Sequence, residues 1–249
     1  MKRRLELLKG FAIGGTDGEI GKVKEFYFDD QSWIVRYLVV ETGGWLSGRK
    51  VLLSPRAVTG TDWEQQLLNV NLTMEQIKNS PDIDTDKPVS RQNERDLYGY
   101  YPWGSYYWGS GGFSGVGMSY PVAMNYNVPQ EVDRPSVDKS NDDPNLRSSR
   151  EVTGYNIKAT DGHIGDLEDL IINDDSWHID FMLVDTGNWF PGKKVVLAPQ
   201  MVIEIKYETS TILVNATEEG VKNSPEYQPG EELTESYEAN LQNYYGRFI

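Results

Sequence analysis

The chain of 249 residues contains no cysteine and only two histidines, His163 and His178. The missing cysteines exclude disulfide bonds and thiolate metal sites, two common ways of holding a small fold or a metal ion. With so few histidines, imidazole-based catalysis and metal binding have few candidate residues. We expect both histidines to lie at the surface or at a rim.

Long apolar runs and excess basic charge are also missing. No run approaches the about 20 apolar residues of a membrane-spanning helix. The basic N-terminus resembles a signal peptide, but Glu6 and Gly10 interrupt its apolar stretch. The 24 Lys and Arg residues face 38 Asp and Glu residues, which gives a formal net charge of −14. This acidic balance argues against nucleic acid and against anionic lipid as partners. We expect a soluble cytoplasmic protein without a membrane span.

What the chain does have is a repeat. Residues 42–55, which contain Thr-Gly-Gly-Trp and Arg-Lys-Val-Leu-Leu-Ser-Pro, return 144 residues later as residues 186–199. The same offset joins Thr-Asp-Gly-Glu-Ile-Gly at 16–21 to Thr-Asp-Gly-His-Ile-Gly at 160–165, without a gap. A constant offset of this length predicts two copies of one structural unit. We therefore divide the chain into residues 1–101, a linker of 102–148, and residues 149–249.

Each unit reads as a set of short strands. Residues 33–40 are aromatic and β-branched throughout, so we expect a strand that is buried on both faces. Eight residues of the repeat are expected in the core: Leu38, Val39, Val40, Leu53, Met182, Leu183, Val184 and Leu197. We expect Gly18 and Gly162 to adopt positive φ in tight hairpin turns. Asp29-Asp30 and the cluster at 173–175 are expected to form turns rather than a calcium site.

Short helices are predicted after the strands. Thr73 and Gln76 fit a capping box, whereas the second unit keeps Thr217 but has Gly220 at the third helical position. Each unit is expected to end in a further helix that carries a leucine and a tyrosine pair, ending at Tyr101 and Tyr245. The linker is rich in aromatics and glycine in its first half and polar in its second half. Its rings could pack on the two units, remain disordered, or recognise another protein, a membrane edge or a sugar.

The Thr-Asp-Gly-x-Ile-Gly hairpin, the long apolar strand after Ser-Trp, and the Lys-Val-x-Leu-x-Pro strand together resemble the PRC-barrel family. This is the small β-barrel of the cytoplasmic part of photosynthetic reaction-centre H subunits. The resemblance covers residues 5 to about 81 and 149 to about 225. It implies an all-β protein of two tandem small antiparallel PRC-type barrels, each followed by short helices. It also implies a docking module, and it brings no catalytic residue set.

The candidate interaction residues are aromatic. Trp45 and Trp189 lie in the glycine-rich loop, where they either fold back over the barrel end or stand as exposed anchors for a partner. Linker rings are the other candidates: Trp103, Tyr106, Tyr107 and Trp108. The basic pairs at 49–50 and 193–194 lie beside the loop tryptophans, either as solvated loops or as carboxylate-binding spots.

These features favour a non-enzymatic docking or scaffold protein, with a stress-associated role as one expectation. An accessory subunit of a membrane-associated electron-transfer complex is a second hypothesis, and a small-molecule-binding protein or enzyme is a third. We expect no catalytic residue, cofactor or metal ion. We expect a protein partner, peripheral contact with a membrane complex as an alternative, and an intramolecular pseudo-dimer of the two barrels.

Overall fold

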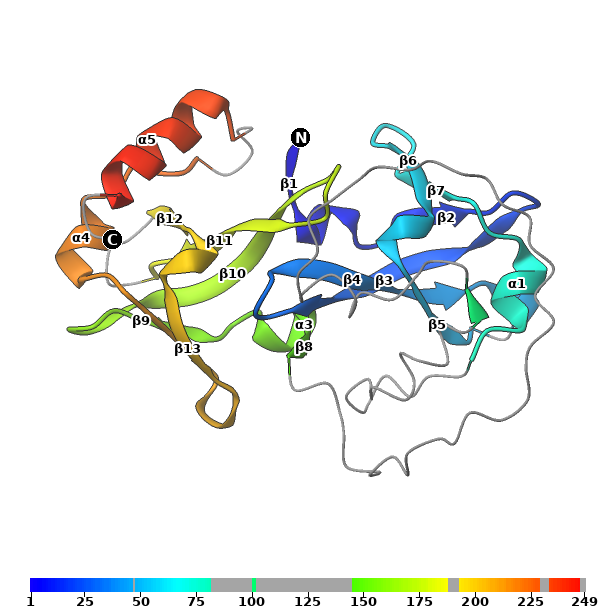
Figure 1. Cartoon of the computed structure of the whole chain (residues 1–249), viewed down its shortest axis with the longest axis horizontal. Helices are drawn as coiled ribbons and strands as arrows, with labels where there is room; N and C mark the ends of the chain where they lie inside the picture. The colour runs from blue at the N-terminus through cyan, green and yellow to red at the C-terminus, as the bar shows by residue number, and fades with distance from the viewer. Residues whose placement is uncertain (47, 82–99, 102–144, 188–192, 229–232, 247–249) are drawn as a thin grey trace, which may run out of the picture.

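The computed structural model describes residues 1–46, 48–81, 100–101, 145–187, 193–228 and 233–246. These residues form two seven-stranded sheets with few short helices, so the fold is all-β with two sheet units. Figure 1 shows the first sheet in blue and cyan and the second in yellow-green to orange, each in its own half of the molecule.

The first sheet has the strand order β5-β4-β3-β2-β7-β6. Its strands are β2 Ala12–Gly14, β3 Glu19–Asp29, β4 Ile34–Thr42, β5 Lys50–Leu53, β6 Val58–Asp62 and β7 Leu67–Val70. Short 3-10 turns η2 Gly44–Leu46 and η3 Pro55–Ala57 connect strands, and helix α1 Met74–Lys78 follows β7.

The second sheet repeats that order as β12-β11-β10-β9-β14-β13. Its strands are β9 Asn156–Lys158, β10 His163–Asn173, β11 Ile179–Asp185, β12 Lys194–Leu197, β13 Val202–Lys206 and β14 Thr211–Val214. The 3-10 turns η5 Pro199–Met201 and η6 Tyr207–Thr209, and helices α4 Glu218–Lys222 and α5 Glu235–Tyr245, complete the unit. Neighbouring strands are antiparallel except β2–β7 and β9–β14, which are parallel. One pair in each unit therefore departs from the expected antiparallel arrangement, because β2 and β9 lie beside the second strand of the last hairpin of their own unit.

The seventh strand of each sheet comes from the other half of the chain. Strand β1, Lys2–Arg4, pairs antiparallel with β10 of the second sheet. Strand β8, Leu146–Ser148, pairs antiparallel with β3 of the first sheet. The two strands occupy equivalent positions in the repeat, and each is followed by one helical turn, η1 Leu5–Leu8 or α3 Ser149–Val152, before the chain enters its own sheet. The two units thus exchange their first strands reciprocally (Figure 1).

This exchange changes the predicted end of the linker. Residues 146–148 were assigned to the linker, yet they form β8, and Ser148 caps helix α3 by accepting hydrogen bonds from the backbone of Arg150 and Glu151. The reason is that Leu146 is buried, with 7% of its surface exposed, so the backbone groups around it need hydrogen-bond partners within the protein. Pairing with β3 supplies these partners. The other linker residues, 102–144, lie outside the described residues.

The two sheets also meet directly at the start of β4 and β11. Val35 N donates to Trp177 O at 2.9 Å, and Ile179 N donates to Trp33 O at 2.7 Å. Val35 is equivalent to Ile179 in the repeat, and Trp33 is equivalent to Trp177. The two bonds are therefore related to one another by a local twofold axis. Trp33 and Trp177 adopt φ of 55° and 58°, which places both in the left-handed region at the end of the preceding turn.

The expected core is confirmed. All eight core residues predicted from the repeat are at most 1% exposed. Strand β4 is buried continuously from Val35 to Val40, so both of its faces are covered, as its unbroken apolar pattern predicts. Part of the outer cover comes from the other unit, since the ring centroids of Phe26 and Trp177 are 6.5 Å apart.

The role of the Thr-Asp-Gly turns differs from the prediction. Gly18 has a positive φ of 158°, as predicted, whereas Gly162 is not among the glycines with positive φ, so the prediction is wrong for Gly162. Instead, each aspartate binds the start of a helix, because Asp17 Oδ1 accepts from Met74 N and Asp161 Oδ1 accepts from Glu218 N, both at 2.8 Å. The turn packs so close to the helix that a Cβ atom on Gly162 would lie 1.8 Å from the Glu218 carboxylate.

The helix caps agree with the sequence. Thr73 Oγ1 accepts from Gln76 N at 3.1 Å, and Gln76 Oε1 accepts from Thr73 N at 2.8 Å, which completes the capping box. In α4 only the first half is present, in which Thr217 Oγ1 accepts from Gly220 N at 3.1 Å. The predicted terminal helix is α5 in the second unit. Of its counterpart in the first unit, only residues 100 and 101 are described.

Candidate functional site

Each long strand carries a β-bulge that directs an acidic side chain toward the strand exchanged from the other unit. The register of β3 shifts between Val23 and Glu25, and that of β10 shifts between Leu167 and Asp169. A bulge places an extra residue in one strand and re-aims its side chain. Glu25 and Asp169 are 3% and 5% exposed, so both carboxylates must find polar partners within the protein.

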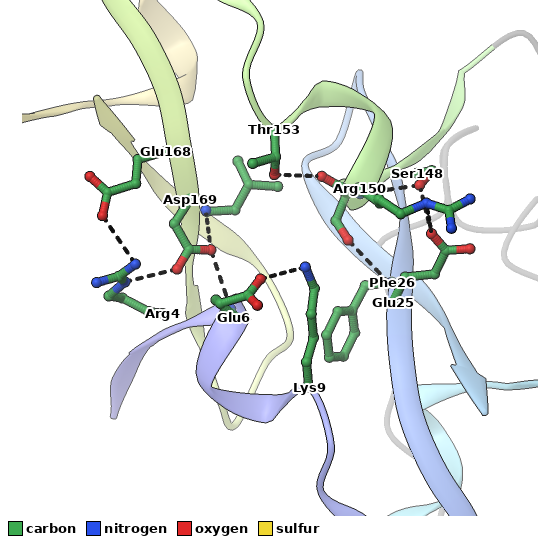
Figure 2. Close-up of polar contacts among 12 residues, drawn as sticks. Arg4, Glu6, Lys9, Glu25, Phe26, Ser148, Arg150, Thr153, Glu168 and Asp169 are labelled. Carbon is green, nitrogen blue, oxygen red and sulfur yellow. Dashed lines mark hydrogen bonds and ion pairs between the residues drawn. The ribbon is translucent and has the colours of Figure 1, made fainter. Parts of the chain in front are cut away.

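Asp169 binds the N-terminal segment in two places (Figure 2). Its Oδ2 accepts from Arg4 Nε at 2.8 Å, and its Oδ1 accepts from Glu6 N at 3.2 Å and from Leu170 N at 2.8 Å. Arg4 also pairs with Glu168 at 3.2 Å. Burial raises the pKa of Asp169, and the hydrogen bond from Arg4 opposes that rise. Asp169 therefore fixes β1 and η1 to the second sheet.

Glu25 has the same position in the first sheet but different partners. Its Oε2 accepts from Ser148 Oγ at 3.1 Å and pairs with Arg150 Nε at 3.2 Å, while Phe26 N donates to Ser149 Oγ at 3.2 Å (Figure 2). Ser148 stands where Arg4 stands in the other copy, and Arg150 stands where Glu6 stands. The cation that pairs with the carboxylate is therefore Arg150, two positions further along the repeat than Arg4. The carboxylate on the bulge still binds the exchanged segment.

The N-terminal strand has one further tie to the second unit. Lys2 Nζ pairs with Asp180 Oδ2 at 3.0 Å and with Glu238 Oε2 of α5 at 2.6 Å, and it lies 4.8 Å from the centroid of the Phe181 ring. Burial lowers the pKa of Lys2, but the hydrogen bonds to Glu238 and Asp180 outweigh this, so its pKa is raised. The C-terminal helix is therefore bound to the first strand of the chain.

The basic pairs beside the loop tryptophans close the helices. Arg49 donates to Lys78 O at 3.0 Å and to Ser80 O at 2.6 Å, and Lys193 Nζ donates to Lys222 O and to Ser224 O at 2.9 Å. Lys78 and Lys222 are the last residues of α1 and α4, and Ser80 and Ser224 follow them by two residues, so the acceptors lie at helix C-termini, where a cation is favourable. The two interpretations from sequence, solvated loop and carboxylate-binding spot, are therefore wrong for the first residue of each pair.

A cavity of about 630 Å³ lies between the two units beside β6. Residues of η3 and β6 line one side, and the turn at 174–177 of the second unit lines the other. Its apolar lining includes Ile34, Pro55 and Trp177, and its charged lining is Arg56, Asp174 and Asp175. Asp174 also bonds to the amino group of Met1.

The equivalent place in the other half of the molecule is filled by polar contacts. There the Tyr207 hydroxyl donates to Asp30 Oδ2 at 2.5 Å, Arg147 Nε donates to the same oxygen at 3.0 Å, and the Arg147 guanidinium lies 3.7 Å from the Tyr207 ring. Burial raises the pKa of Tyr207 strongly, and the carboxylate of Asp30 adds to the rise. Trp63 replaces Tyr207 beside the cavity and has no hydroxyl to make this bond.

Strand composition at the cavity differs in the same way. Thr59, Gly60 and Thr61 of β6 stand where β13 has Ile203, Glu204 and Ile205. The side chains of β6 are therefore smaller than those of β13 at these three positions. No motif in the sequence indicates this cavity, but the mismatch between the two copies at these three positions could have drawn attention to it.

Residues 3–71 match the PRC-barrel domain family, and this range contains β2 to β7 with the whole of the first sheet's own strands. The first unit is a PRC-barrel domain. The second unit lies outside the matched range and has the same strand order. No curated protein matches the chain.

The candidate interaction residues lie mostly outside the described residues. This holds for Trp189 and for the four linker aromatics at 103, 106, 107 and 108. The backbone of Trp45 belongs to η2, and its side chain is not described. The structure therefore brings none of these side chains together, and their role as anchors stays a prediction.

The other predicted positions are described. Asp29 and Asn173 side chains accept hydrogen bonds from the backbone of the residues that follow, Ser32 and Ser176 among them, so these clusters form turns. His163 is exposed, and His178 Nδ1 lies 2.7 Å from Asp180 Oδ1. Among the residues the structure describes, no helix is long and apolar enough to cross a bilayer.

Proposed function

We propose that this protein is a non-enzymatic docking or scaffold protein of the cytoplasm, built from two PRC-barrel modules and binding another protein. The second unit is proposed as the second module on its matching strand order. The observation that carries the proposal is the reciprocal exchange of β1 and β8, because it fixes two related surfaces relative to one another. A platform that holds two sites in constant geometry favours simultaneous binding over separate encounters.

The polar residues that recur in the repeat support the same proposal. Asp17 and Asp161 cap helices, Arg49 and Lys193 close helices, and the bulged carboxylates hold the exchanged strands. The motifs of the repeat thus serve to build the platform. The polar residues are thereby accounted for, which leaves the aromatic residues of the glycine-rich loops and of the linker as the better candidates for partner recognition.

The test is affinity purification of the tagged full chain from its native lysate after mild cross-linking. We compare the wild type with two variants, Trp45→Ser/Trp189→Ser and a linker variant in which Trp103, Tyr106, Tyr107 and Trp108 are replaced by serine. Substitution is better than deletion, because β8 begins at Leu146 and must keep its connection. We expect one protein partner at constant stoichiometry that is lost from at least one variant. A wild type that captures no protein at constant stoichiometry would contradict the proposal.

An accessory subunit of a membrane-associated electron-transfer complex is the second candidate. The match to the PRC-barrel family favours it, since barrels of this kind occur in reaction-centre H subunits. Fractionation of native cells decides between the candidates. Recovery with a membrane complex supports the accessory role, and recovery with a soluble partner supports the cytoplasmic scaffold.

A further inference from the structure

The strands at the sheet edges are protected to different degrees. On the second sheet, the edge strand β12 is covered where Tyr227 N donates to Lys194 O at 3.1 Å. The other edge strand, β13, carries Glu204 and Lys206, which pair at 3.4 Å. Charged side chains on an edge strand discourage the pairing of another strand. Both edges of the second sheet are therefore covered or guarded.

Strand β6 is the corresponding edge of the first sheet and has less protection. Its charged residue is Asp62, at the end of the strand, and residues 58–61 are Val-Thr-Gly-Thr. Within the described part of the chain, the hydrogen-bond partners of these residues belong to β7, which leaves the outward edge open. An edge strand exposes a row of backbone N–H and C=O groups that can pair with an added strand.

The cavity between the units runs along this edge. Its lining includes four consecutive residues of β6, Val58 to Thr61, and faces the turn that contains Asp174 and Asp175. Four residues of strand extend over about 13 Å, at about 3.3 Å for each residue. A volume of about 630 Å³ is of the size that ligand-binding pockets usually have. The groove can therefore hold about four residues of an extended peptide.

The lining favours a particular side-chain pattern. Successive side chains of a strand point to opposite sides, so alternate residues of an added peptide would face Ile34, Pro55 and Trp177. The opposite wall presents Asp175, whose side chain is 89% exposed, beside Asp174 and the amino group of Met1, and Arg56 lies at one end. The net charge of −14 attracts cationic partners over longer distances. In a peptide of alternating apolar and basic residues, the apolar side chains match the apolar lining. The basic side chains match the acidic wall and the negative net charge of the protein.

We propose that the edge of β6 is a peptide-binding groove that takes an extended partner segment of alternating apolar and basic residues as an added strand. Main-chain hydrogen bonds to β6 supply affinity, and the cavity selects the side chains. This inference rests on the proposed docking function and assigns it a site that is distinct from the aromatic candidates.

The probe is a labelled, end-blocked hexapeptide of alternating valine and lysine, measured by fluorescence anisotropy with the full chain. A valine–glutamate peptide tests the charge preference. A valine–lysine peptide methylated at alternate backbone nitrogens tests strand addition, because methylation removes the donors. We expect the unmodified valine–lysine peptide to bind at least about tenfold more tightly than either comparison peptide.

The blocking variant copies the guarded strand of the second unit into the first, as T59I/G60E/T61I. A side chain fits at Gly60, since a Cβ atom there would have no neighbour within 4 Å. We expect at least about tenfold weaker binding of the valine–lysine peptide. Asp175→Asn should weaken it about two- to fivefold, because an exposed charge contributes little. The matched control is Gln31→Ala at the equivalent position of the first unit, which should leave affinity unchanged.

Several results would refute the proposal that the β6 edge binds a peptide. They are no binding of the valine–lysine peptide up to millimolar concentration, equal binding of the methylated peptide, and unchanged affinity in the blocking variant. A concentration-dependent dimer that the blocking variant abolishes would assign β6 to a second copy of the chain instead. A native partner that the blocking variant still captures would leave the docking function standing and refute its placement here.

Discussion

Replacing Asp169 with alanine removes the carboxylate that holds the exchanged N-terminal strand. The change leaves Arg4 Nε, Glu6 N and Leu170 N without the acceptor that they share. Arg4 is partly exposed, with 25% of its side chain accessible, so water can replace some of the lost ion pair. Leu170 N lies in the buried part of β10 and has no such replacement.

The expected loss of unfolding free energy is about 3 kcal/mol. A buried donor that loses its acceptor costs about 1–3 kcal/mol, and a fully buried ion pair that loses one partner costs about 3–5 kcal/mol. The partial exposure of Arg4 and the burial cost that raises the pKa of Asp169 both reduce the sum. Urea unfolding followed by tryptophan fluorescence measures the loss, and hydrogen exchange of residues 2–6 locates it.

Glu25→Ala is the matched control at the equivalent bulge. Glu25 accepts from Ser148 Oγ and pairs with Arg150, whose side chain is 67% exposed, so we expect a loss of only about 1 kcal/mol. The reasoning predicts a larger loss for Asp169→Ala than for Glu25→Ala, with faster exchange confined to the N-terminal segment. A loss below about 0.5 kcal/mol for Asp169→Ala, or the reverse order, would refute it.

Three further predictions concern the units themselves. Gly21→Ala should cost more than about 2 kcal/mol in thermal or urea unfolding, because its Cβ atom would lie 2.1 Å from Glu41 O, whereas Gly60→Ala has open space and should cost less than about 1 kcal/mol. Lys193→Met should cost about 1–2 kcal/mol and lower the helical signal, since it leaves the carbonyls of Lys222 and Ser224 without their donor. Burial raises the pKa of Tyr101 to about 12. The folded pKa lies above the unfolded value of about 10, so the contribution of Tyr101 to the unfolding free energy is complete below about pH 10 and is lost as the pH rises to about 12. Between about pH 10 and pH 12, the unfolding free energy of Tyr101→Phe should therefore fall by about 2 kcal/mol less than that of the wild type.

Local patterns in the sequence predicted much of each unit. The unbroken apolar run at 33–40 predicted a strand buried on both faces, and β4 is buried in this way. The Thr73–Gln76 spacing predicted a capping box, and both of its hydrogen bonds are present. These features depend on residues close in the chain, so periodicity and spacing are enough to find them.

Contacts between distant residues were not predictable in the same way. Nothing in Lys2–Arg4 or Leu146–Ser148 indicates which sheet each strand joins, because a three-residue strand pairs equally well with either long strand by its own pattern. The prediction for the second of the two glycine turns, at Gly162, was wrong for a similar reason. A glycine in a turn suggests positive φ, whereas Gly162 is needed for the close approach of Glu218, which lies 56 residues further along the chain.

The cavity beside β6 needed three separate segments to be placed. Its lining combines η3 and β6 with the turn of the second unit, which the contact between the two units brings together. The signal that the sequence does contain is the difference between Thr-Gly-Thr at 59–61 and Ile-Glu-Ile at 203–205. Such a difference indicates that the surface of β6 differs from that of β13. It does not indicate which segment of the other unit faces β6 across the cavity.

Disulfide trapping tests the strand exchange most directly, because the chain has no cysteine of its own. Lys2 faces Asn173 across β1 and β10, whereas an unexchanged β1 would face Asp29, the equivalent residue of its own unit. Directly opposed residues of antiparallel strands lie within the Cα distance that a disulfide needs. We predict that the Lys2→Cys/Asn173→Cys variant forms the intramolecular bond under mild oxidation and that the Lys2→Cys/Asp29→Cys variant does not. Bond formation in the second variant and not in the first would contradict the exchange.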